Sequence, residues 1–102
     1  MNVLERIHSQ VTGNRVVLYM KGTPQFPQCG YSATAAQVLK ACGLTEFLAV
    51  NVLTDPEIFY NLKDYANWPT FPQLYVDGQL VGGADIMREM YQKGELQTLL
   101  AQ

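Results

Sequence analysis

The sequence predicts an α/β fold, in which a mixed four-stranded sheet carries helices on both faces. Three observations predict it. Apolar residues recur at helical spacing in several segments, and short apolar runs typical of strands lie between them. A strand, a helix and a second strand follow one another early in the chain, which favours a parallel pair with a right-handed crossover. Asp77-Gly78 separates two alternating segments, a strong signal for an antiparallel hairpin.

The first half of the chain is expected to alternate helix and strand. Residues 3–12 place apolar side chains at helical spacing, and residues 15–20 form an apolar run typical of a strand buried on both faces. Residues 22–28 contain two prolines, so a stiff, non-helical connector is expected there. Residues 32–42 are predicted to form the second helix and residues 46–52 the second strand.

The second half completes the order αβαβαββα, with a short C-terminal helix after Gly94. "TDPE" has the capping-box pattern with Thr54 as the cap, so a third helix is expected from there to about Tyr65. The hairpin spans residues 72–83, and Asp85 is expected to cap the last long helix. Residues 1–102 are expected to form a single domain, because the chain has no repeat and no linker.

Composition excludes several classes of function. A net charge of -2 and a pI of about 5.2 provide no field to hold a nucleic-acid backbone. No apolar run approaches the roughly 18 residues that a membrane span requires, and the amphipathic start carries Glu5, unlike a secretory signal. We therefore expect a soluble protein without nucleic-acid or membrane partners, located in a bacterial cytoplasm or an organelle matrix.

The two cysteines are predicted to be separate thiols. Cys29 and Cys42 lie at opposite ends of the predicted second helix, and a rise of about 1.5 Å per residue holds them roughly 20 Å apart, beyond disulfide reach. Cys42 shares the apolar register of that helix, where a free cysteine packs as a small hydrophobe. Cys29 precedes the helix in a loop rich in proline and glycine, which predicts an accessible thiol.

Cys29 is the candidate reactive group. The N-terminus of the following helix and the positive charge of Lys21 are both expected to lower the pKa of its thiol. Ser32 stands where a Cys-x-x-Cys motif would place the second cysteine, so any disulfide of Cys29 must form with a molecule from outside the chain. The Ser32 hydroxyl is expected to cap the helix or to donate a weak hydrogen bond to the Cys29 sulfur.

Two further segments suit a peptide-like ligand. Pro72 opens the third strand, and a cis Phe71-Pro72 bond would let Phe71 offer its backbone N–H and C=O to such a ligand; the alternative is a trans proline that only starts an edge strand. Trp68 is either a binding aromatic or a core residue. "GGADI" offers backbone N–H groups beside an acidic side chain, suited to an α-carboxylate and an α-ammonium, although an ordinary helix cap is equally compatible.

Taken together, "YMKG", "CGYS", "NWPTFPQLYVDG" and "GGADI" resemble the monothiol glutaredoxins, whose usual signature is Cys-Gly-Phe-Ser. The resemblance covers nearly the whole chain in the same order. Tyr31 departs from it by adding a hydroxyl to the ring. Phe59 stands where the family often has an arginine that helps to bind the glycine carboxylate of glutathione. Ala84 stands where many members have cysteine, a change that keeps the backbone N–H.

The resemblance implies a thioredoxin fold with a cis Pro72 and a groove for glutathione. Lys21 would pair with the glycine carboxylate, Thr70 and Phe71 would meet the cysteinyl backbone, and Ala84 and Asp85 would hold the γ-glutamyl end. The full set of residues predicted to bind glutathione or cluster is Lys21, Cys29, Tyr31, Thr70, Phe71, Pro72, Gly83, Ala84 and Asp85, with Cys29 as the metal ligand and the catalytic thiol.

The resemblance also implies an iron–sulfur role. A [2Fe-2S] cluster needs four ligands, which two Cys29 thiolates and two glutathione thiolates would supply across a homodimer. The family acts in cluster assembly, cluster transfer and iron homeostasis, often together with BolA-like proteins and cluster-accepting apoproteins. The alternative is a glutathione-dependent thiol–disulfide oxidoreductase that removes glutathione from proteins with Cys29 as nucleophile. A redox-inert adaptor is a third class.

Overall fold

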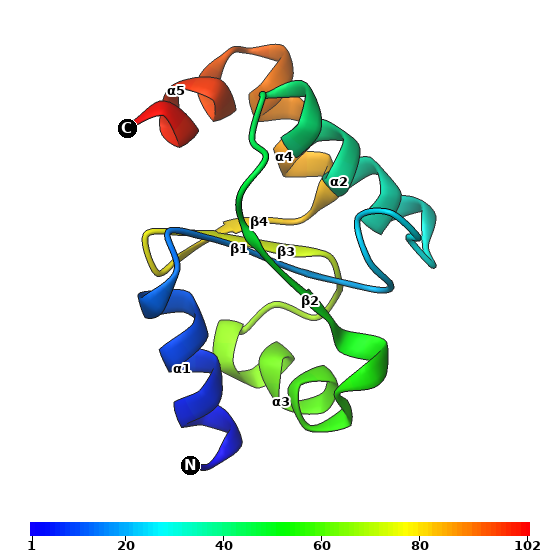
Figure 1. The fold of residues 1–102 in the computed structure, drawn as a ribbon, viewed down its shortest axis with the longest axis vertical. Coiled ribbons are helices and arrows are strands. Elements are labelled where there is room, and N and C mark those ends of the chain that lie inside the picture. The colour runs from blue at the N-terminus through cyan, green and yellow to red at the C-terminus, as the bar shows by residue number, and fades with distance from the viewer.

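A four-stranded sheet lies between two layers of helices in the computed structural model, which describes residues 1–102 (Figure 1). The strand order is β2-β1-β3-β4. β1 pairs in parallel with β2 and antiparallel with β3, which in turn pairs antiparallel with β4. The predicted mixed sheet is therefore confirmed. The strands are β1 (Val16–Met20), β2 (Leu48–Asn51), β3 (Gln73–Val76) and β4 (Gln79–Gly82).

The helices cover both faces of the sheet, as predicted. In Figure 1, α1 and α3 lie below the sheet, and α2, α4 and α5 lie above it. No helix combines the length and the apolar composition that a membrane crossing requires. The helices are α1 (Val3–Gly13), α2 (Gly30–Ala41), α3 (Pro56–Ala66), α4 (Ala84–Gln92) and α5 (Glu95–Ala101), and a short 3₁₀ helix, η1 (Val52–Thr54), precedes α3.

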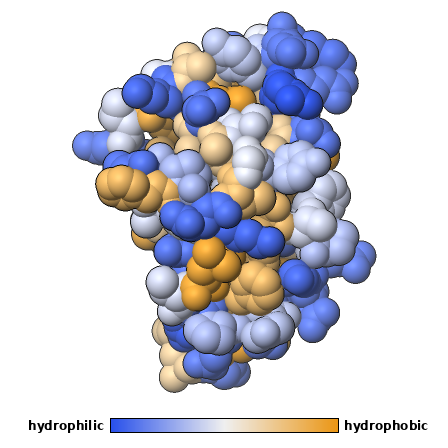
Figure 2. All heavy atoms as spheres, turned by 90° about the vertical axis from the view of Figure 1, so that its right-hand side faces the viewer, coloured by the Kyte–Doolittle hydropathy of each residue, from blue (hydrophilic) through white to orange (hydrophobic).

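The connector between β1 and α2 is a tight reversal and not an open loop. Thr23 and Phe26 exchange two backbone hydrogen bonds of 3.2 and 3.1 Å, and the N–H of Gln28 donates to the C=O of Lys21 at 2.9 Å. Phe26 is 75% exposed. Figure 2, viewed from the side of the connector, shows apolar atoms reaching the surface in small areas between polar side chains. These hydrogen bonds hold the start of α2 against the end of β1.

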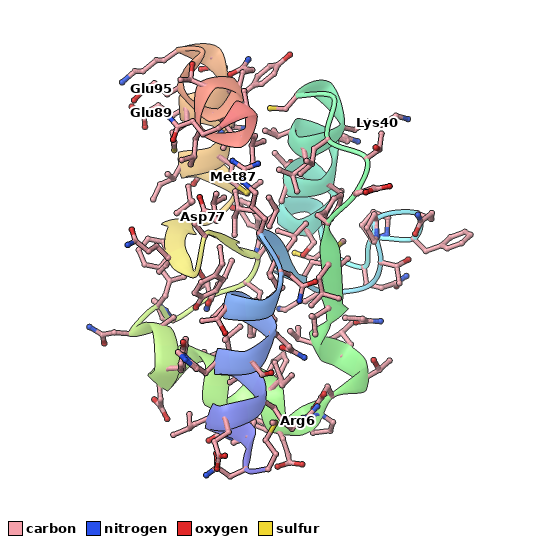
Figure 3. All side chains as sticks on the ribbon, turned by 60° about the vertical axis from the view of Figure 1, so that its left-hand side comes forward. Arg6, Lys40, Asp77, Met87, Glu89 and Glu95 are labelled. Carbon is pink, nitrogen blue, oxygen red and sulfur yellow. The ribbon has the colours of Figure 1, made fainter.

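The core has two halves, one on each face of the sheet. Successive side chains of β1 point to opposite faces, so Leu18 joins the upper half and Tyr19 the lower half, and both are fully buried. Met87 projects from α4 into the upper half (Figure 3), and Ile58 of α3 fills the lower one. This explains why β1 reads as a continuous apolar run instead of an alternating one.

The hairpin turn confirms the prediction from Asp77-Gly78. Both residues have positive φ, 52° and 80°, the combination that a type I′ turn requires and that Asp-Gly adopts readily. Asp77 also pairs with Arg15 at 3.6 Å across the sheet end. The short turn aligns β3 and β4 directly, so α4 begins next to the loop that precedes β3.

Two predicted helix caps and both predicted bounds of the second strand are wrong, since that strand begins at Leu48 and not at residue 46. Asp55, not Thr54, is the N-cap of α3, and its carboxylate accepts a hydrogen bond of 3.3 Å from the N–H of Ile58. The Thr54 hydroxyl instead donates to the C=O of Asn51 at 3.0 Å, because the chain turns through η1 before α3. That turn also ends the second strand at Asn51, short of the predicted residue 52.

The predicted cap of the last long helix is also displaced. Gly83 is the N-cap of α4, and Asp85 lies inside the first turn without capping it. Its carboxylate pairs with Arg88 at 3.2 Å, one turn further along. The Asp85 side chain is exposed.

Candidate functional site

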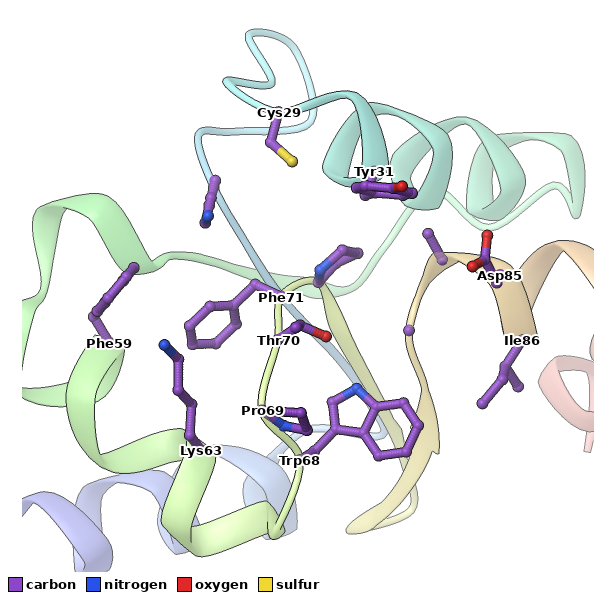
Figure 4. A pocket seen from close by; sticks show the side chains of 14 residues that line it. Cys29, Tyr31, Phe59, Lys63, Trp68, Pro69, Thr70, Phe71, Asp85 and Ile86 are labelled. Atoms are coloured by element: carbon purple, nitrogen blue, oxygen red, sulfur yellow. The ribbon is translucent and has the colours of Figure 1, made fainter.

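The nine residues singled out in the sequence all line one pocket of about 480 Å³ (Figure 4). This volume is in the range typical of small-molecule sites. The residues come from four places that are distant in the sequence: the end of β1, the start of α2, the loop before β3 and the start of α4. They are Lys21, Cys29, Tyr31, Thr70, Phe71, Pro72, Gly83, Ala84 and Asp85.

Cys29 is the N-cap residue of α2 and points its sulfur toward the pocket (Figure 4). Its pKa is lowered, chiefly by the backbone N–H of Ser32. The N–H of Tyr31 and the positive charge of Lys21 act in the same direction, while partial burial opposes them. The sulfur does not accept a regular N-cap hydrogen bond. The backbone N–H groups at the start of α2 therefore stabilise the thiolate mainly because their positive ends point toward the sulfur.

Of the two roles predicted for Ser32, capping α2 is wrong, whereas a weak interaction of its hydroxyl with the Cys29 sulfur agrees with the structure. Ser32 lies within the first turn and is fully buried. Its Oγ accepts a hydrogen bond of 3.0 Å from the backbone N–H of Lys21, and its hydroxyl contributes least to lowering the pKa of the Cys29 thiol. Ser32 therefore has mainly a structural role, joining α2 to the end of β1.

The Phe71-Pro72 peptide bond is cis, as the sequence suggested. Neither the N–H nor the C=O of Phe71 takes part in a hydrogen bond within the chain. Phe71 is otherwise buried, with 7% of its surface exposed, and it lines the pocket. Its backbone groups are thus the natural partners for a peptide-like ligand.

Gln73 holds this wall of the pocket in place, a role that the sequence analysis missed. It is fully buried, and its Nε2 donates to the C=O groups of Trp68 and Thr70, each at 3.2 Å. Its Oε1 accepts from the Tyr75 hydroxyl at 3.1 Å. A glutamine in a strand normally suggests an exposed position, so the sequence offered little signal for this role.

Trp68 belongs to the pocket wall and not to either half of the core. Its indole Nε1 is buried and has no hydrogen-bond partner in the chain. The ring faces Gly83, where an added Cβ would lie 3.7 Å from Nε1 and 3.3 Å from the C=O of Pro72. Gly83 therefore allows the loop before β3 to approach the start of α4.

The start of α4 forms the opposite side of the pocket. The first N–H groups of a helix have no partner within it, so those of Ala84 and Asp85 are available to a ligand beside the Asp85 carboxylate. That carboxylate lies on the opposite side of the pocket from Lys63 (Figure 4). One side of the pocket thus has a basic side chain and the other an acidic one, Asp85, which pairs with Arg88.

Three pocket residues escaped the sequence analysis: Lys63, Pro69 and Ile86. Lys63 follows Phe59 by four residues on α3, a spacing that places both on one helix face and that could have been recognised. Its Nζ lies 4.9 Å from the centre of the Phe59 ring. Phe59, at the position where the resemblance suggested an arginine, therefore contributes an aromatic ring. Lys63, one turn later on α3, contributes the positive charge.

Cys42 is confirmed as a packing residue. It is partly buried beside the upper half of the core and forms no disulfide. Burial raises the pKa of its thiol, the opposite of the shift at Cys29. The two thiols thus differ in chemistry as well as position.

Comparisons with known proteins agree with this geometry. The glutaredoxin family model matches residues 16–81. The chain is 57% identical to glutaredoxin 4 of Escherichia coli (strain K12) over 97 residues, covering 95% of this chain and 84% of that protein. It is 54% identical to glutaredoxin 4 of Pasteurella multocida (strain Pm70) over 101 residues, covering 99% and 92%.

Solved structures show the same fold. The solution structure of reduced poplar apo GrxS14 superposes with a TM-score of 0.80 at 46% identity, covering 95% of this chain and 88% of that one. A monomeric truncated mutant of Trypanosoma brucei 1-C-Grx1 superposes with a TM-score of 0.87 at 35% identity, covering 99% and 91%. The expected thioredoxin fold is therefore confirmed.

Proposed function

Since this chain belongs to the glutaredoxin family and is a monothiol member of it, we propose that it binds glutathione and carries a [2Fe-2S] cluster for iron–sulfur assembly and iron homeostasis. The observation that carries the proposal is the placement of Cys29. Its thiol, with a lowered pKa, stands over a pocket with basic side chains on one side and the acidic side chain of Asp85 on the other. A ligand with a carboxylate at one end, an ammonium at the other and a thiol between them matches this arrangement.

Glutathione has that layout. Its glycine carboxylate would lie at the side of Lys21, and its cysteinyl backbone would pair with the free N–H and C=O of Phe71. Its γ-glutamyl carboxylate would accept from the first N–H groups of α4, and its ammonium would face Asp85. In this orientation the glutathione thiol lies beside Cys29.

The ligand count favours a shared cluster as the cargo. A [2Fe-2S] cluster is held by four ligands, usually thiolates, and the chain has no group of three or more His, Cys, Asp or Glu side chains able to hold a metal. One chain offers Cys29 alone. Two chains with two bound glutathione molecules offer four thiolates, so the proposed carrier is a homodimer that forms around its cluster.

The exposed rim is the proposed contact for partners. Tyr31, next to Cys29, is 62% exposed and lines the pocket. We propose that a second copy, a BolA-like protein or an apoprotein receiving the cluster meets the chain here. The Tyr31 hydroxyl adds a donor and acceptor at this contact.

Anaerobic reconstitution with ferrous iron, sulfide and glutathione tests the carrier function. We expect a coloured species at twice the mass of the chain, formed only when glutathione is present. Cys29→Ser should abolish it, and the matched variant Cys42→Ser should retain it, because Cys42 packs beside the core far from the pocket. Normal cluster binding by Cys29→Ser would exclude the proposal.

The lowered pKa of Cys29 also supports a second function, a glutathione-dependent oxidoreductase. Its thiolate would attack the glutathione sulfur of a protein mixed disulfide, breaking the S–S bond and releasing the protein thiolate, which takes a proton from water. The thiolate of a second glutathione would then attack the bound glutathione, freeing Cys29 and forming oxidised glutathione. Efficient turnover of a glutathionylated protein would favour this function, and slow turnover would favour the carrier.

A further inference from the structure

A second groove, of about 530 Å³, lies between the first turns of α2 and α4 and opens beside the pocket described above. Three residues line both cavities, so the two are continuous at the reactive thiol. Figure 4 shows Tyr31 on the side of α2 that faces Asp85 at the start of α4. This α2–α4 groove is lined by Cys29, Gly30, Tyr31, Thr34, Asp85 and Arg88.

We propose that the α2–α4 groove binds the segment of a partner protein whose cysteine exchanges with Cys29, and that Arg88 and Tyr31 select a carboxylate side chain in that segment. The inference rests on the proposed function, since it names the kind of protein substrate that reaches the same thiol. The groove is the surface that Cys29 adjoins outside the glutathione pocket, so a partner bonded to that thiol has to cross it.

Arg88 keeps most of its hydrogen-bonding capacity for a partner. Its Nη2 donates to Oδ1 of Asp85 at 3.2 Å, the one hydrogen bond of this side chain within the chain. A guanidinium carries several further N–H donors in a planar fork that matches a carboxylate. The side chain is 56% exposed, so a partner can reach it. A ligand ammonium at Asp85 would compete for the same carboxylate and leave Arg88 more available.

The Tyr31 hydroxyl is a second donor on the same groove. It has no hydrogen-bond partner within the chain, unlike the hydroxyls of Tyr19 and Tyr75. Thr34, by contrast, already donates its hydroxyl to the C=O of Gly30 at 3.1 Å. A carboxylate accepts hydrogen bonds from a phenol and from a guanidinium at once. An acidic side chain is therefore the group that suits this groove.

The length of the groove sets the spacing between that acidic side chain and the cysteine of the partner. Gly30 and Thr34 are four positions apart on α2, a rise of about 6 Å along the helix. An extended segment advances about 3.3 Å per residue. A partner whose sulfur meets Cys29 would thus carry its carboxylate roughly two residues before or after its own cysteine.

The test measures how fast the chain removes glutathione from peptides of the form acetyl-X-Ala-Cys-Ala-X-amide, where X is glutamate, glutamine or lysine. Each peptide carries glutathione on its cysteine as a mixed disulfide. The Cys29 thiolate attacks the glutathione sulfur, the S–S bond breaks, and the peptide thiolate leaves and takes a proton from water. Release of the peptide thiol is followed in a single turnover with the protein in excess.

Two precautions isolate the contribution of the groove. Each rate is divided by the rate of the same peptide with free glutathione, which removes the effect of X on the peptide's own thiol. Salt at about 0.15 M screens exposed charges that lie more than about 8 Å apart. Preferences are then compared as ratios between peptides for one protein, so a change in affinity for the glutathione part cancels.

For wild type we expect the glutamate peptide to react about threefold faster than the glutamine peptide, the effect of one partly exposed charge contact, and the lysine peptide to react slowest. Arg88→Gln should remove this preference, and Arg88→Glu should reverse it in favour of lysine. Tyr31→Phe should weaken the preference without removing it. Lys40→Gln should retain it, because Lys40 is exposed at the end of α2 and points into solvent (Figure 3).

Equal rates for the three peptides with wild type, or a preference for glutamate that persists in Arg88→Gln, would overturn the assignment of the groove. A wild-type chain that reacts with none of the peptides would overturn the nucleophilic function of Cys29 itself, and the inference with it. The two failures are distinguishable, because the first leaves the exchange reaction intact and the second abolishes it.

Discussion

The Oγ of Ser32 accepts a hydrogen bond of 3.0 Å from the backbone N–H of Lys21. The two residues belong to the first turn of α2 and to the segment that leaves β1, so this bond joins the helix that carries the thiol to the sheet. Ser32 is fully buried, so no water molecule can take over this hydrogen bond. Ser32, which stands where a second cysteine would be, therefore fixes the start of α2, and with it Cys29, to the end of β1.

Replacing Ser32 with alanine is expected to destabilise the fold. The Lys21 N–H would remain buried without an acceptor, which costs about 1–3 kcal/mol. Urea denaturation measures the loss, and Ser9→Ala, at an exposed position of α1, provides the control. The pKa of Cys29 should change little, because the backbone N–H of residue 32 remains and is the main cause of its lowering. A stability equal to that of Ser9→Ala would contradict this role.

The two thiols are expected to react over different pH ranges. Helix N–H groups lower the pKa of Cys29, and burial raises that of Cys42, so the thiolate of Cys29 forms at lower pH. Alkylation rates with iodoacetamide, measured against pH in Cys42→Ser and Cys29→Ser variants, give each midpoint separately. The midpoint for Cys29 should lie below that of an ordinary thiol and that for Cys42 above it. The reverse order would refute the assignment.

Asp55 should stabilise the protein in two separable ways. It caps α3, and it pairs with Arg6, which projects from α1 toward the start of α3 (Figure 3). The side chains of Arg6 and Asp55 are 34% and 26% exposed, so solvent screening makes the pair weaker than the N-cap, which contributes about 1 kcal/mol. Asp55→Ala should lose both contributions, whereas Asp55→Asn, which can still cap the helix, should lose mainly the charge pairing with Arg6. Equal losses in the two variants would argue against the cap.

The same carboxylate predicts a pH dependence of stability. Arg6 lowers the pKa of Asp55 in the folded state, so its stabilisation is complete above the unfolded pKa of about 4 and is lost as the pH falls through the lowered folded value. Thermal midpoints of wild type and Asp55→Asn should therefore differ above pH 5 and converge in more acidic solution. A constant difference down to pH 2 would show that ionisation of Asp55 is not involved.

Gly22 should be irreplaceable in the connector before Cys29. Its φ is +92°, and an added Cβ would lie 2.5 Å from the C=O oxygen of Phe26 and 2.7 Å from the N of Gln28, closer than atoms can approach. We expect Gly22→Ala to cost more than about 2 kcal/mol. Gly43→Ala is the matched control, because Gly43 has a similar φ of +80° but open space around it. Equal losses would show that the backbone angle alone matters.

Local patterns predicted most of the secondary structure. Helical periodicity indicated α1 and α2 within a residue or two, the TDPE pattern indicated α3, and Asp77-Gly78 indicated the hairpin, because these signals depend on neighbours in the chain. The caps were less predictable. Thr54 and Asp55 are both good N-cap residues, and the choice between them depended on η1, a turn with no clear signature in the sequence.

The sequence by itself determined the elements of this protein, the parallel and antiparallel pairings they allow, and a candidate reactive thiol, Cys29, without a resolving partner. Only the tertiary structure decided the order β2-β1-β3-β4, the burial of Ser32 and the position of Lys63 over the rings of Phe59 and Phe71. The physical reason is that side-chain direction and solvent access depend on contacts between residues far apart in the chain. Periodicity carries information about one element at a time, whereas the pocket exists only where five segments meet.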